Sequence, residues 1–584
     1  MDWMAVATRL VSGDTEGIAA YRYRPGQCAH YTPDQEAPPL LRATPESQGI
    51  RSGAIAALYR DLDRALELEP HSFLMLRHGR VVAESHWSPY RPDVPQTLYS
   101  LSKSLVSTAV GLAVSDGVLD LDETAAAILG FRPSDEREKY DRRVLGITLR
   151  HLLTMTSGTS FNEALSLFNE DWVQTFFTSP LLFDPGTEFR YNSMNTYLLS
   201  AALRRRTGRG LLAFLADRVF RPIGISSAHW DLCPKGIEKG GWGLSLTTES
   251  MARIGQLYLQ NGVWGDGEEQ TRVLPEAWIR EAVTPWAYAK RDRNDPGYGY
   301  GYQIWRCARP GAYEFNGAFG QYVIVAPDLD LVIAMTSANG QSFPDSPAER
   351  ILWKHLDAPD TMVQTGSLPE DPKALSVLRA MEASHALHPS DLSPRPLEEA
   401  SFHNRMYRMD RNRAGLLPSV IQTVYANFSR GIDTAVFLFD DPDADECRLV
   451  LSEGNDLNTL PIGLDGHPRY GTVSIGGQLL QVGTTGRWSV DHRDHRVLMV
   501  RVAFIETPDT RIIRCAFRPD GTIRLSFSEI PSAGSALDQI NQLIGTLDFA
   551  NRRLLVYALK RHGTQFRAMA SSLLTPSVEG KPST

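Results

Sequence analysis

The chain has 584 residues, of which 42% are hydrophobic and 22% are charged, a composition typical of a folded globular protein of about two to four domains. The formal net charge of -8 provides no basic field, so we expect no nucleic-acid partner. No apolar run approaches the roughly 18 residues of a membrane-spanning helix, so we expect no membrane partner.

The N-terminus and the cysteines indicate a cytoplasmic protein. The first residues, "MDWMAVATRLVSGDTEG", lack the cationic start and the long apolar core of a signal peptide. The five cysteines are widely spaced and form no CxxC pair, which favours a reduced compartment. "HRDH" at 492–495 is the nearest approach to a metal motif and is more typical of a solvated hairpin turn. We therefore expect neither a metal nor another cofactor.

The N-terminal half of the chain mixes strand and helix patterns. Residues 1–40 are irregular and are predicted to form an arm. The stretch 72–87 consists of two apolar runs around His78-Gly79, which predicts a β-hairpin, and 314–338 predicts two buried strands joined by a Pro-Asp turn. Helical periodicity predicts helices at 100–116, 148–156, 194–206 and 250–262.

The texture of the sequence changes in the C-terminal half. Residues 358–400 are rich in Pro, Asp and Ser, which predicts a linker with some helix. From 401 to 555, short β-type runs alternate with turn residues, as in an all-β barrel or sandwich, and 556–584 is predicted to be a tail. The fold class is therefore an α/β (α+β) domain over 41–357 followed by an all-β domain.

A serine and a lysine three residues apart begin the apolar run "LYSLSKSLVSTAVGL". On a helix, Lys103 would lie on the same face as Ser100 and could take the proton of its hydroxyl if burial kept the amine neutral. The alternative is that Ser100 caps the helix while Lys103 points to water. This spacing recurs by chance, so the pair alone does not decide between the two.

Two later stretches supply residues of the kind that such a nucleophile needs. "DPGTEFRYNS" places Tyr191 and Ser193 at the start of an apolar helix, where both can share a proton network with Ser100. "FNGAFGQY" contains Gly317 and Gly320 in a strand whose backbone N–H can point at a substrate carbonyl oxygen. Each has a structural alternative, namely an interfacial tyrosine beside an N-cap serine and a pair of bulge glycines.

Taken in order, "YSLSKS", "ITLRHLLTMTSG", "DPGTEFRYNS", "GGWGLSLTTES" and "GAFGQYVIVAPDLDLVIAM" closely resemble one family. It is that of the penicillin-recognising serine hydrolases related to class C β-lactamases and D-alanyl-D-alanine carboxypeptidases. Within it, the sequence is most similar to the branch of 6-aminohexanoate-dimer hydrolases and esterases. The resemblance covers about residues 45–355 and implies an antiparallel sheet flanked by helices, with a helical lobe. His151 in "RHLLTMTSG" is interpreted as a core or capping residue.

The resemblance also implies roles for individual residues. Ser100 would be the nucleophile that forms an acyl-enzyme, Lys103 its proton acceptor, and Tyr191 the group that carries the proton to the leaving group. Ser193 stands where many members have asparagine. The oxyanion hole would consist of the backbone N–H groups of Ser100 and Ala318, next to Gly317, although Gly320-Gln321 is an alternative register.

The sequence departs from β-lactamases where they have Lys-Thr-Gly or His-Thr-Gly. Here Phe315-Asn316-Gly317 removes the cation that would pair with a substrate carboxylate, which favours neutral amides or esters. Phe315 is expected to line the pocket. Trp242, Tyr298 and Trp305 are further candidates for the pocket wall and could equally belong to the core.

These features predict a serine hydrolase that cleaves an amide, short-peptide or ester bond in a small-molecule or peptide substrate. The alternatives are a β-lactamase or D-amino-acid peptidase and a penicillin-binding sensor without turnover. The C-terminal domain resembles lipocalin-like barrels appended to some family members. It could shape the cleft, form a homodimer interface or bind an apolar ligand.

Overall fold

A computed structural model describes most of the chain, in two compact units. The first comprises Gln27–His86 and Pro92–Ala383, and the second contains Trp87–Arg91 and the described residues from Ser384 onward. The described residues are 27–132, 140–166, 169–265, 270–290, 297–340, 346–357, 362–387, 394–425, 427–441, 444–532 and 576–583. Most of the expected arm and of the expected tail therefore lies outside them.

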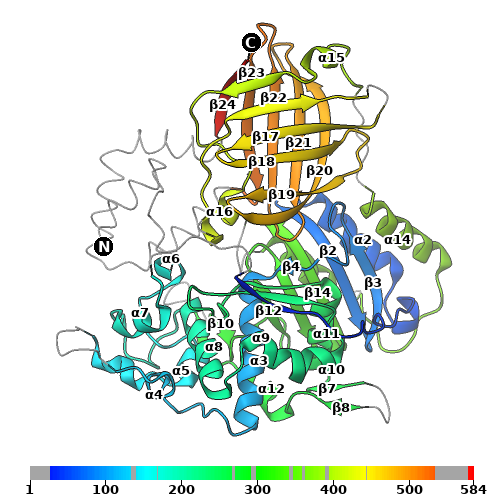
Figure 1. Cartoon of the computed structure of the whole chain (residues 1–584). Coiled ribbons are helices and arrows are strands. Elements are labelled where there is room, and N and C mark those ends of the chain that lie inside the picture. The colour runs from blue at the N-terminus through cyan, green and yellow to red at the C-terminus, as the bar shows by residue number, and fades with distance from the viewer. Residues whose placement is uncertain are drawn as a thin grey trace. The chain divides into compact units, whose positions relative to one another are not determined.

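The centre of the first unit is an eight-stranded antiparallel sheet (Figure 1). Its strands, in spatial order, are β3 (Arg80–His86), β2 (Leu68–Arg77), β14 (Leu331–Asn339), β13 (Gln321–Ala326), β12 (Tyr313–Gly317), β11 (Trp305–Arg306), β10 (Tyr298–Tyr300) and β9 (Ala287–Ala289). The β2–β3 hairpin turns at His78-Gly79, as expected. The region 314–338 forms three strands instead of two, because the glycines after Asn316 reverse the chain once more.

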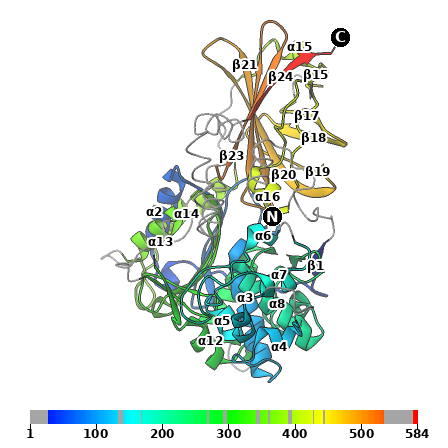
Figure 2. The same cartoon turned by 90° about the vertical axis from the view of Figure 1, so that its left-hand side faces the viewer.

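Helices cover both faces of this sheet. On one face, α2 (Ser52–Arg64) packs the ring of Tyr59 edge-on against Phe73, and α13 (Pro347–Leu356) lies beside α2 (Figure 2). On the other face, α11 (Thr248–Leu259) approaches the sheet closely at Gly255, where an added Cβ would lie 2.5 Å from Val332. The core therefore sits between the sheet and these two helical layers.

The remaining helices of the first unit form a lobe beside the sheet. They are α3 (Ser102–Ser115), α4 (Ala125–Leu129), α5 (Leu149–Leu153), α6 (Glu163–Ser166), α7 (Trp172–Thr178), α8 (Ser193–Thr207), α9 (Leu211–Leu215), α10 (Arg221–Ile223) and α12 (Glu276–Val283), with α14 (Pro372–His385) following α13. The four predicted helices are confirmed as α3, α5, α8 and α11. No helix among the described residues is long and apolar enough to cross a membrane.

A second, four-stranded sheet lies next to the lobe and leads into α3. Its order is β1 (Cys28–Tyr31), β5 (Ala228–Asp231), β6 (Leu244–Leu246) and β4 (Gln96–Thr97), and a small pair, β7 (Val263–Trp264) with β8 (Thr271–Arg272), is separate from it.

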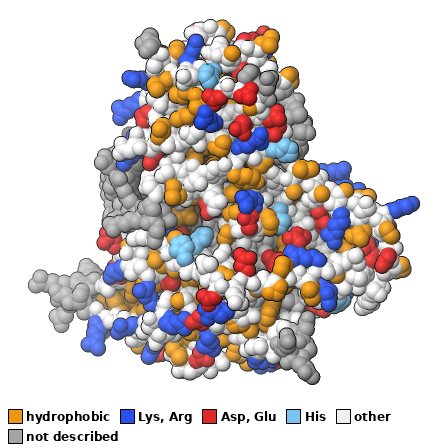
Figure 3. Space-filling model, turned by 45° about the vertical axis from the view of Figure 1, so that its right-hand side comes forward, with side chains coloured by type: hydrophobic (Ala, Val, Ile, Leu, Met, Phe, Trp, Pro, Cys, Tyr) orange, Lys and Arg blue, Asp and Glu red, His pale blue; other side chains and the backbone are white. Residues whose placement is uncertain are grey.

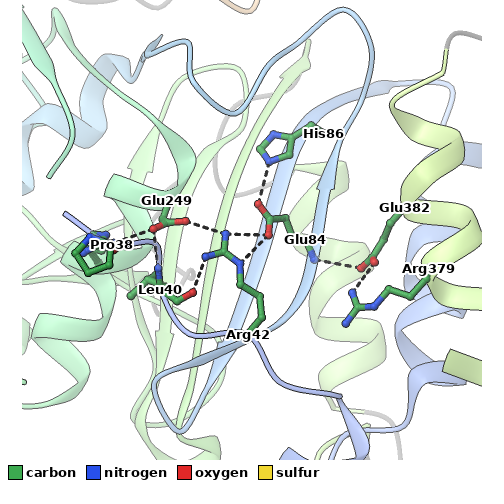
Figure 4. Close-up of polar contacts among 9 residues, drawn as sticks. Pro38, Leu40, Arg42, Glu84, His86, Glu249, Arg379 and Glu382 are labelled. Carbon is green, nitrogen blue, oxygen red and sulfur yellow. Dashed lines mark hydrogen bonds and ion pairs between the residues drawn. The ribbon is translucent and has the colours of Figure 1, made fainter. Parts of the chain in front are cut away.

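A polar network fastens the segment before α2 to the rest of the first unit (Figure 4). The guanidinium of Arg42 pairs with Glu84 on β3 at 3.0 Å and with Glu249 on α11 at 2.8 Å. Glu249 also accepts from the backbone N–H of Leu40, and Glu84 donates its own N–H to Glu382 on α14. One arginine thus joins segments that are far apart in the sequence.

The second unit is an all-β barrel, which confirms that expectation. Its sheet contains β18 (Asp456–Gly463), β17 (Glu446–Glu453), β16 (Thr434–Leu438), β15 (Met406–Met409), β24 (Ser577–Pro582), β23 (Ile523–Ile530), β22 (Thr510–Phe517), β21 (Arg496–Phe504), β20 (Gln478–Val490) and β19 (Arg469–Ile475). A parallel bridge between β18 and β20 closes the ring, with β19 beside it. Two short helices, α15 (Glu399–Phe402) and α16 (Ser419–Tyr425), precede β15 and β16.

Strand β24 corrects the expectation that 556–584 is only a tail. It pairs with β23 on one side and β15 on the other. The sequence of β24, "SVEGKP", contains glycine and proline and has a weak strand signal, so its pairing is decided by the two strands it joins.

On the face of the molecule in Figure 3, acidic and basic side chains are interspersed, in keeping with the small net charge.

Among the described residues, the barrel interior contains apolar side chains and a buried ion pair between Arg511 and Glu529. Phe437, Leu449 and Val500 are among the buried residues of this core. The guanidinium of Arg511 donates to Glu529 at 2.7 Å, and both side chains are almost completely buried. Burial lowers the pKa of Arg511, and the nearby carboxylates of Glu529 and Glu453 oppose that shift.

Arg511→Met should destabilise the barrel by about 3–5 kcal/mol, because it leaves the Glu529 carboxylate buried without its counter-ion. Hydrogen exchange of β22 and β23, followed against denaturant, measures this free energy. The double variant Arg511→Met/Glu529→Gln should recover part of the loss, whereas Arg448→Met, which breaks an exposed pair with Asp440, should change little. Equal losses of stability in all three variants would contradict a stabilising role for the buried Arg511–Glu529 pair.

Candidate active site

Strand β4 brings Ser100 to the start of α3. The backbone of Leu98 donates to Leu244 on β6 at 2.8 Å, and Ser100 follows in the 3-10 turn Tyr99–Leu101. Ser102 Oγ donates to the carbonyl of Tyr99 at 2.6 Å and accepts from the N–H of Leu244 at 3.2 Å. Ser102 thus holds the turn in place, and the half-buried Ser100 is the serine that meets the candidate base.

Lys103 is buried and does not point to water. Its side chain is 1% exposed, and its Nζ lies 2.8 Å from Ser100 Oγ and donates to the carbonyl oxygen of Gly241 at 2.8 Å. Burial lowers the pKa of Lys103 to about 7. Near neutral pH, a large fraction of the amine is therefore uncharged and can accept the serine proton.

Tyr191 lies on the other side of the same hydroxyl. Its phenol is hydrogen-bonded to Ser100, burial raises its pKa, and Lys103 Nζ is 4.8 Å from the centre of its ring. The helix cap next to it is Asn192 and not Ser193: the Asn192 amide donates to Phe161 at 2.7 Å and its oxygen accepts from Met194. This cap fixes the position of Tyr191, which directly precedes it in the sequence.

Aromatic rings surround Tyr191. Trp305 stacks on it with ring centres 5.7 Å apart, and Tyr300 meets it edge-on at 6.1 Å. Trp242 directly follows Gly241, the residue whose carbonyl holds Lys103, and its half-buried ring stacks on Trp172. Tyr298 is also half-buried, on β10 two residues before Tyr300. Of the aromatic candidates, Trp305 therefore has the most direct contact with the catalytic candidates.

Phe315 is not part of a pocket wall, contrary to our expectation. Its side chain is 0% exposed and packs edge-on against Tyr258 of α11, with ring centres 4.8 Å apart. Side chains alternate along β12, so Phe315 faces the α11 layer of the core while Glu314 and Asn316 face the opposite side. The argument that its apolar side chain selects the substrate therefore fails.

The end of β12 approaches the nucleophile turn. A Cβ on Gly317 would lie 2.1 Å from the carbonyl oxygen of Leu98, so only glycine allows this approach. The next residue, Ala318, is half-buried, whereas Gly320 and Gln321 are buried and Gln321 donates to the carbonyl of Ser337 at 2.8 Å. This placement favours Ala318 over Gly320-Gln321 as the second oxyanion donor.

Sequence reasoning missed Glu163. This half-buried residue begins the one-turn helix α6, and its Oε1 accepts from the backbone N–H of Ser193 at 3.0 Å, at the first turn of α8. Burial lowers the pKa of Lys103, and the negative charge of Glu163 opposes that shift. Burial raises the pKa of Tyr191, and the same charge adds to that rise. No motif marks Glu163, since only the folded chain brings α6 to the start of α8.

Two other sequence candidates have structural roles. His151 completes a capping box at α5: its Nδ1 accepts from the N–H of Thr148 at 3.2 Å, which confirms the capping interpretation. His495 of the 492–495 stretch contacts Asp491 at 3.2 Å beside a turn between β20 and β21. The described residues contain no cluster of three or more histidine, cysteine or acidic side chains that could hold a metal.

Comparison with known proteins assigns the first unit to a family. The family model described as Beta-lactamase matches residues 55–357, more than half of the chain, so the protein belongs to the β-lactamase family and is a serine hydrolase of that family. The 6-aminohexanoate-dimer hydrolase of Paenarthrobacter ureafaciens is 28% identical over 333 residues, which are 52% of this chain and 80% of that protein.

Two further similarities are more limited. Monacolin J acid methylbutanoyltransferase of Aspergillus terreus is 30% identical over 166 residues, 25% of this chain and 40% of that protein. A solved penicillin-binding protein homologue from Caulobacter crescentus is 16% identical with a TM-score of 0.41, covering 59% of this chain and 98% of that one.

Glu163→Gln should shift the acidic limb of the kcat/KM profile to lower pH. Removing the negative charge makes the protonated form of Lys103 less favourable, while the amide oxygen can still accept from Ser193. The pH dependence of aryl-ester hydrolysis measures the shift, with Glu188→Gln, an exposed carboxylate three residues before Tyr191, as the matched control. A uniform loss at every pH would show that Glu163 acts only on the fold.

Proposed function

We propose that the protein cleaves an amide, short-peptide or ester bond through an acyl-enzyme on Ser100. The observation that carries this proposal is the 2.8 Å contact between Ser100 Oγ and the Nζ of a fully buried Lys103. A serine hydroxyl becomes nucleophilic when a neighbouring base takes its proton, and burial makes this lysine such a base.

The arrangement supports a two-step reaction. Lys103 accepts the Ser100 proton as Oγ attacks the carbonyl carbon, and the backbone N–H groups of Ser100 and Ala318 bind the resulting oxyanion. Tyr191 donates its proton to the departing amine or alcohol and is reprotonated through Lys103, which leaves the acyl group on Ser100. Water then attacks the ester carbonyl and gives its proton to Lys103 or Tyr191. As the bond to Ser100 Oγ breaks, that proton passes to Oγ, which releases the acid and regenerates the free serine.

The substrate class is proposed from the relatives and from the sequence at 315–317. The names of the two relatives above point to hydrolysis of a 6-aminohexanoate dimer and to transfer of a methylbutanoyl group, and the acyl-enzyme proposed here is compatible with either reaction. The absence of the Lys-Thr-Gly or His-Thr-Gly cation from the sequence at 315–317 still favours a neutral substrate over a β-lactam carboxylate.

Ser100→Ala should abolish both hydrolysis and covalent labelling by a fluorophosphonate, because it removes the hydroxyl that contacts Lys103 Nζ. Mass spectrometry of the labelled wild-type protein should place the probe on Ser100. Ser104→Ala is the matched control, since Ser104 Oγ donates to the carbonyl of Gln303 inside the core and should not affect labelling. A label on any other residue would contradict the assignment of the nucleophile.

The rate of acylation should rise with pH through about 7, because only the neutral form of Lys103 can accept the serine proton. Below that pH the rate should fall about tenfold per unit, as expected for a single titrating base. Lys103→Arg should lower the rate by about 100-fold or more at all pH values, since arginine keeps its proton. If the acidic limb of the pH–rate profile is unchanged in Lys103→Arg, the titration behind that limb belongs to a different group.

A substrate panel separates the remaining alternatives. An aryl ester, an ω-amino-acid amide, a D-Ala-D-Ala peptide and a chromogenic cephalosporin are compared by kcat/KM. Faster turnover of the cephalosporin or the D-peptide would favour a β-lactamase or D-amino-acid peptidase. An acyl-enzyme that forms stoichiometrically and never hydrolyses would favour a sensor.

A further inference from the structure

Two aromatic residues beside the candidate oxyanion hole have unusual backbone conformations. Tyr99, directly before Ser100, has φ of 48°, and Phe319, directly after Ala318, has φ of 65°. This left-handed region favours glycine, and a bulky residue in it is strained. The same kind of strain therefore occurs on both segments that carry the proposed donors.

The two strained residues touch each other. Their rings meet edge-on with centres 5.1 Å apart, and Tyr99 and Phe319 are only 9% and 3% exposed. An edge-to-face pair of this kind contributes stability beyond the burial of its surface. A glycine at either position would relieve the backbone strain and would forfeit this contact.

Each ring belongs to a segment that is anchored on its own side. The carbonyl of Tyr99 accepts from Ser102 Oγ at 2.6 Å, which ties the nucleophile turn to α3. The carbonyl of Phe319 accepts from the N–H of Asn339 at 3.1 Å and from Ser337 Oγ at 3.3 Å, which ties the other loop to β14. The ring pair therefore joins two separately fixed parts of the scaffold.

The two segments meet at a second point, where Gly317 approaches the carbonyl oxygen of Leu98. This contact limits how closely the segments can approach, because anything larger than hydrogen at Gly317 would clash. The Tyr99–Phe319 ring pair is a further contact between the same two segments. Ala318 lies between Gly317 and Phe319 in sequence. Ser100 directly follows Leu98 and Tyr99.

We propose that the Tyr99–Phe319 ring pair is a positioning device that sets the separation of the two oxyanion donors. The proposal rests on the function proposed above. An oxyanion donor must lie about 2.7–3.1 Å from the developing charge, and loss of one donor typically lowers kcat by about 100- to 1000-fold. If the ring pair is removed and the two donors are less well fixed, kcat should fall by a part of this 100- to 1000-fold factor.

The test uses the full chain with Tyr99→Gly, Phe319→Gly and the double variant, assayed with p-nitrophenyl acetate. Each single variant should lower the acylation rate by about 10- to 100-fold with little change in KM. The double variant should be no slower than the worse single one, because either change removes the same contact. Additive losses, or wild-type rates in the single variants, would overturn the proposal.

Two conservative variants distinguish positioning from simple core filling. Tyr99→Phe keeps the ring and should retain most of the rate, whereas Phe319→Leu keeps apolar bulk without a ring and should slow acylation. If Phe319→Leu acts at the wild-type rate, the ring contact is unimportant and the proposal is wrong. These two variants also provide the answer if the glycine variants fail to fold.

A thionoester substrate adds a readout that a purely structural role would not change. Sulfur is larger than oxygen, so a well-fixed oxyanion hole should discriminate strongly between the ester and its thiono analogue. The glycine variants should narrow this rate ratio, and an unchanged ratio would count against the proposal. Fluorophosphonate labelling at Ser100 in the wild type keeps a failure of this proposal separate from a failure of the proposed function.

Discussion

The burial of Lys103 is the constraint on which the rest of the candidate site depends. A lysine in water would be charged at neutral pH and could not take a proton from Ser100. Here α3 places the side chain inside the first unit, and the carbonyl of Gly241 gives the amine one hydrogen-bond acceptor there. Tyr191 and Glu163 then act on a proton network that exists because this amine can be neutral.

Placing the backbone groups of the site requires strained backbone conformations, which lower the stability of the fold. Gly317 allows β12 to reach the nucleophile turn, and Tyr99 and Phe319 hold strained conformations on the two facing segments. Strain of this kind persists only where neighbouring contacts over-determine it. In this protein those contacts come from Ser102 on α3 and from Asn339 on β14.

The second unit relies on a different principle. Its barrel is closed, so most strand edges are paired, and its interior is packed with apolar side chains around the Arg511–Glu529 pair. The chemistry described above lies wholly in the first unit.

The sequence by itself determined the α/β and all-β halves, because these depend on local periodicity, and the order of its motifs carried the family resemblance that implied the candidates Ser100, Lys103 and Tyr191. The tertiary structure alone decided the burial of Lys103, the approach of Glu163 to the start of α8, the core position of Phe315 and the pairing of β24. Each of these depends on which distant segments pack together. That packing sets the local dielectric, the partners of each polar group and the face that each side chain occupies.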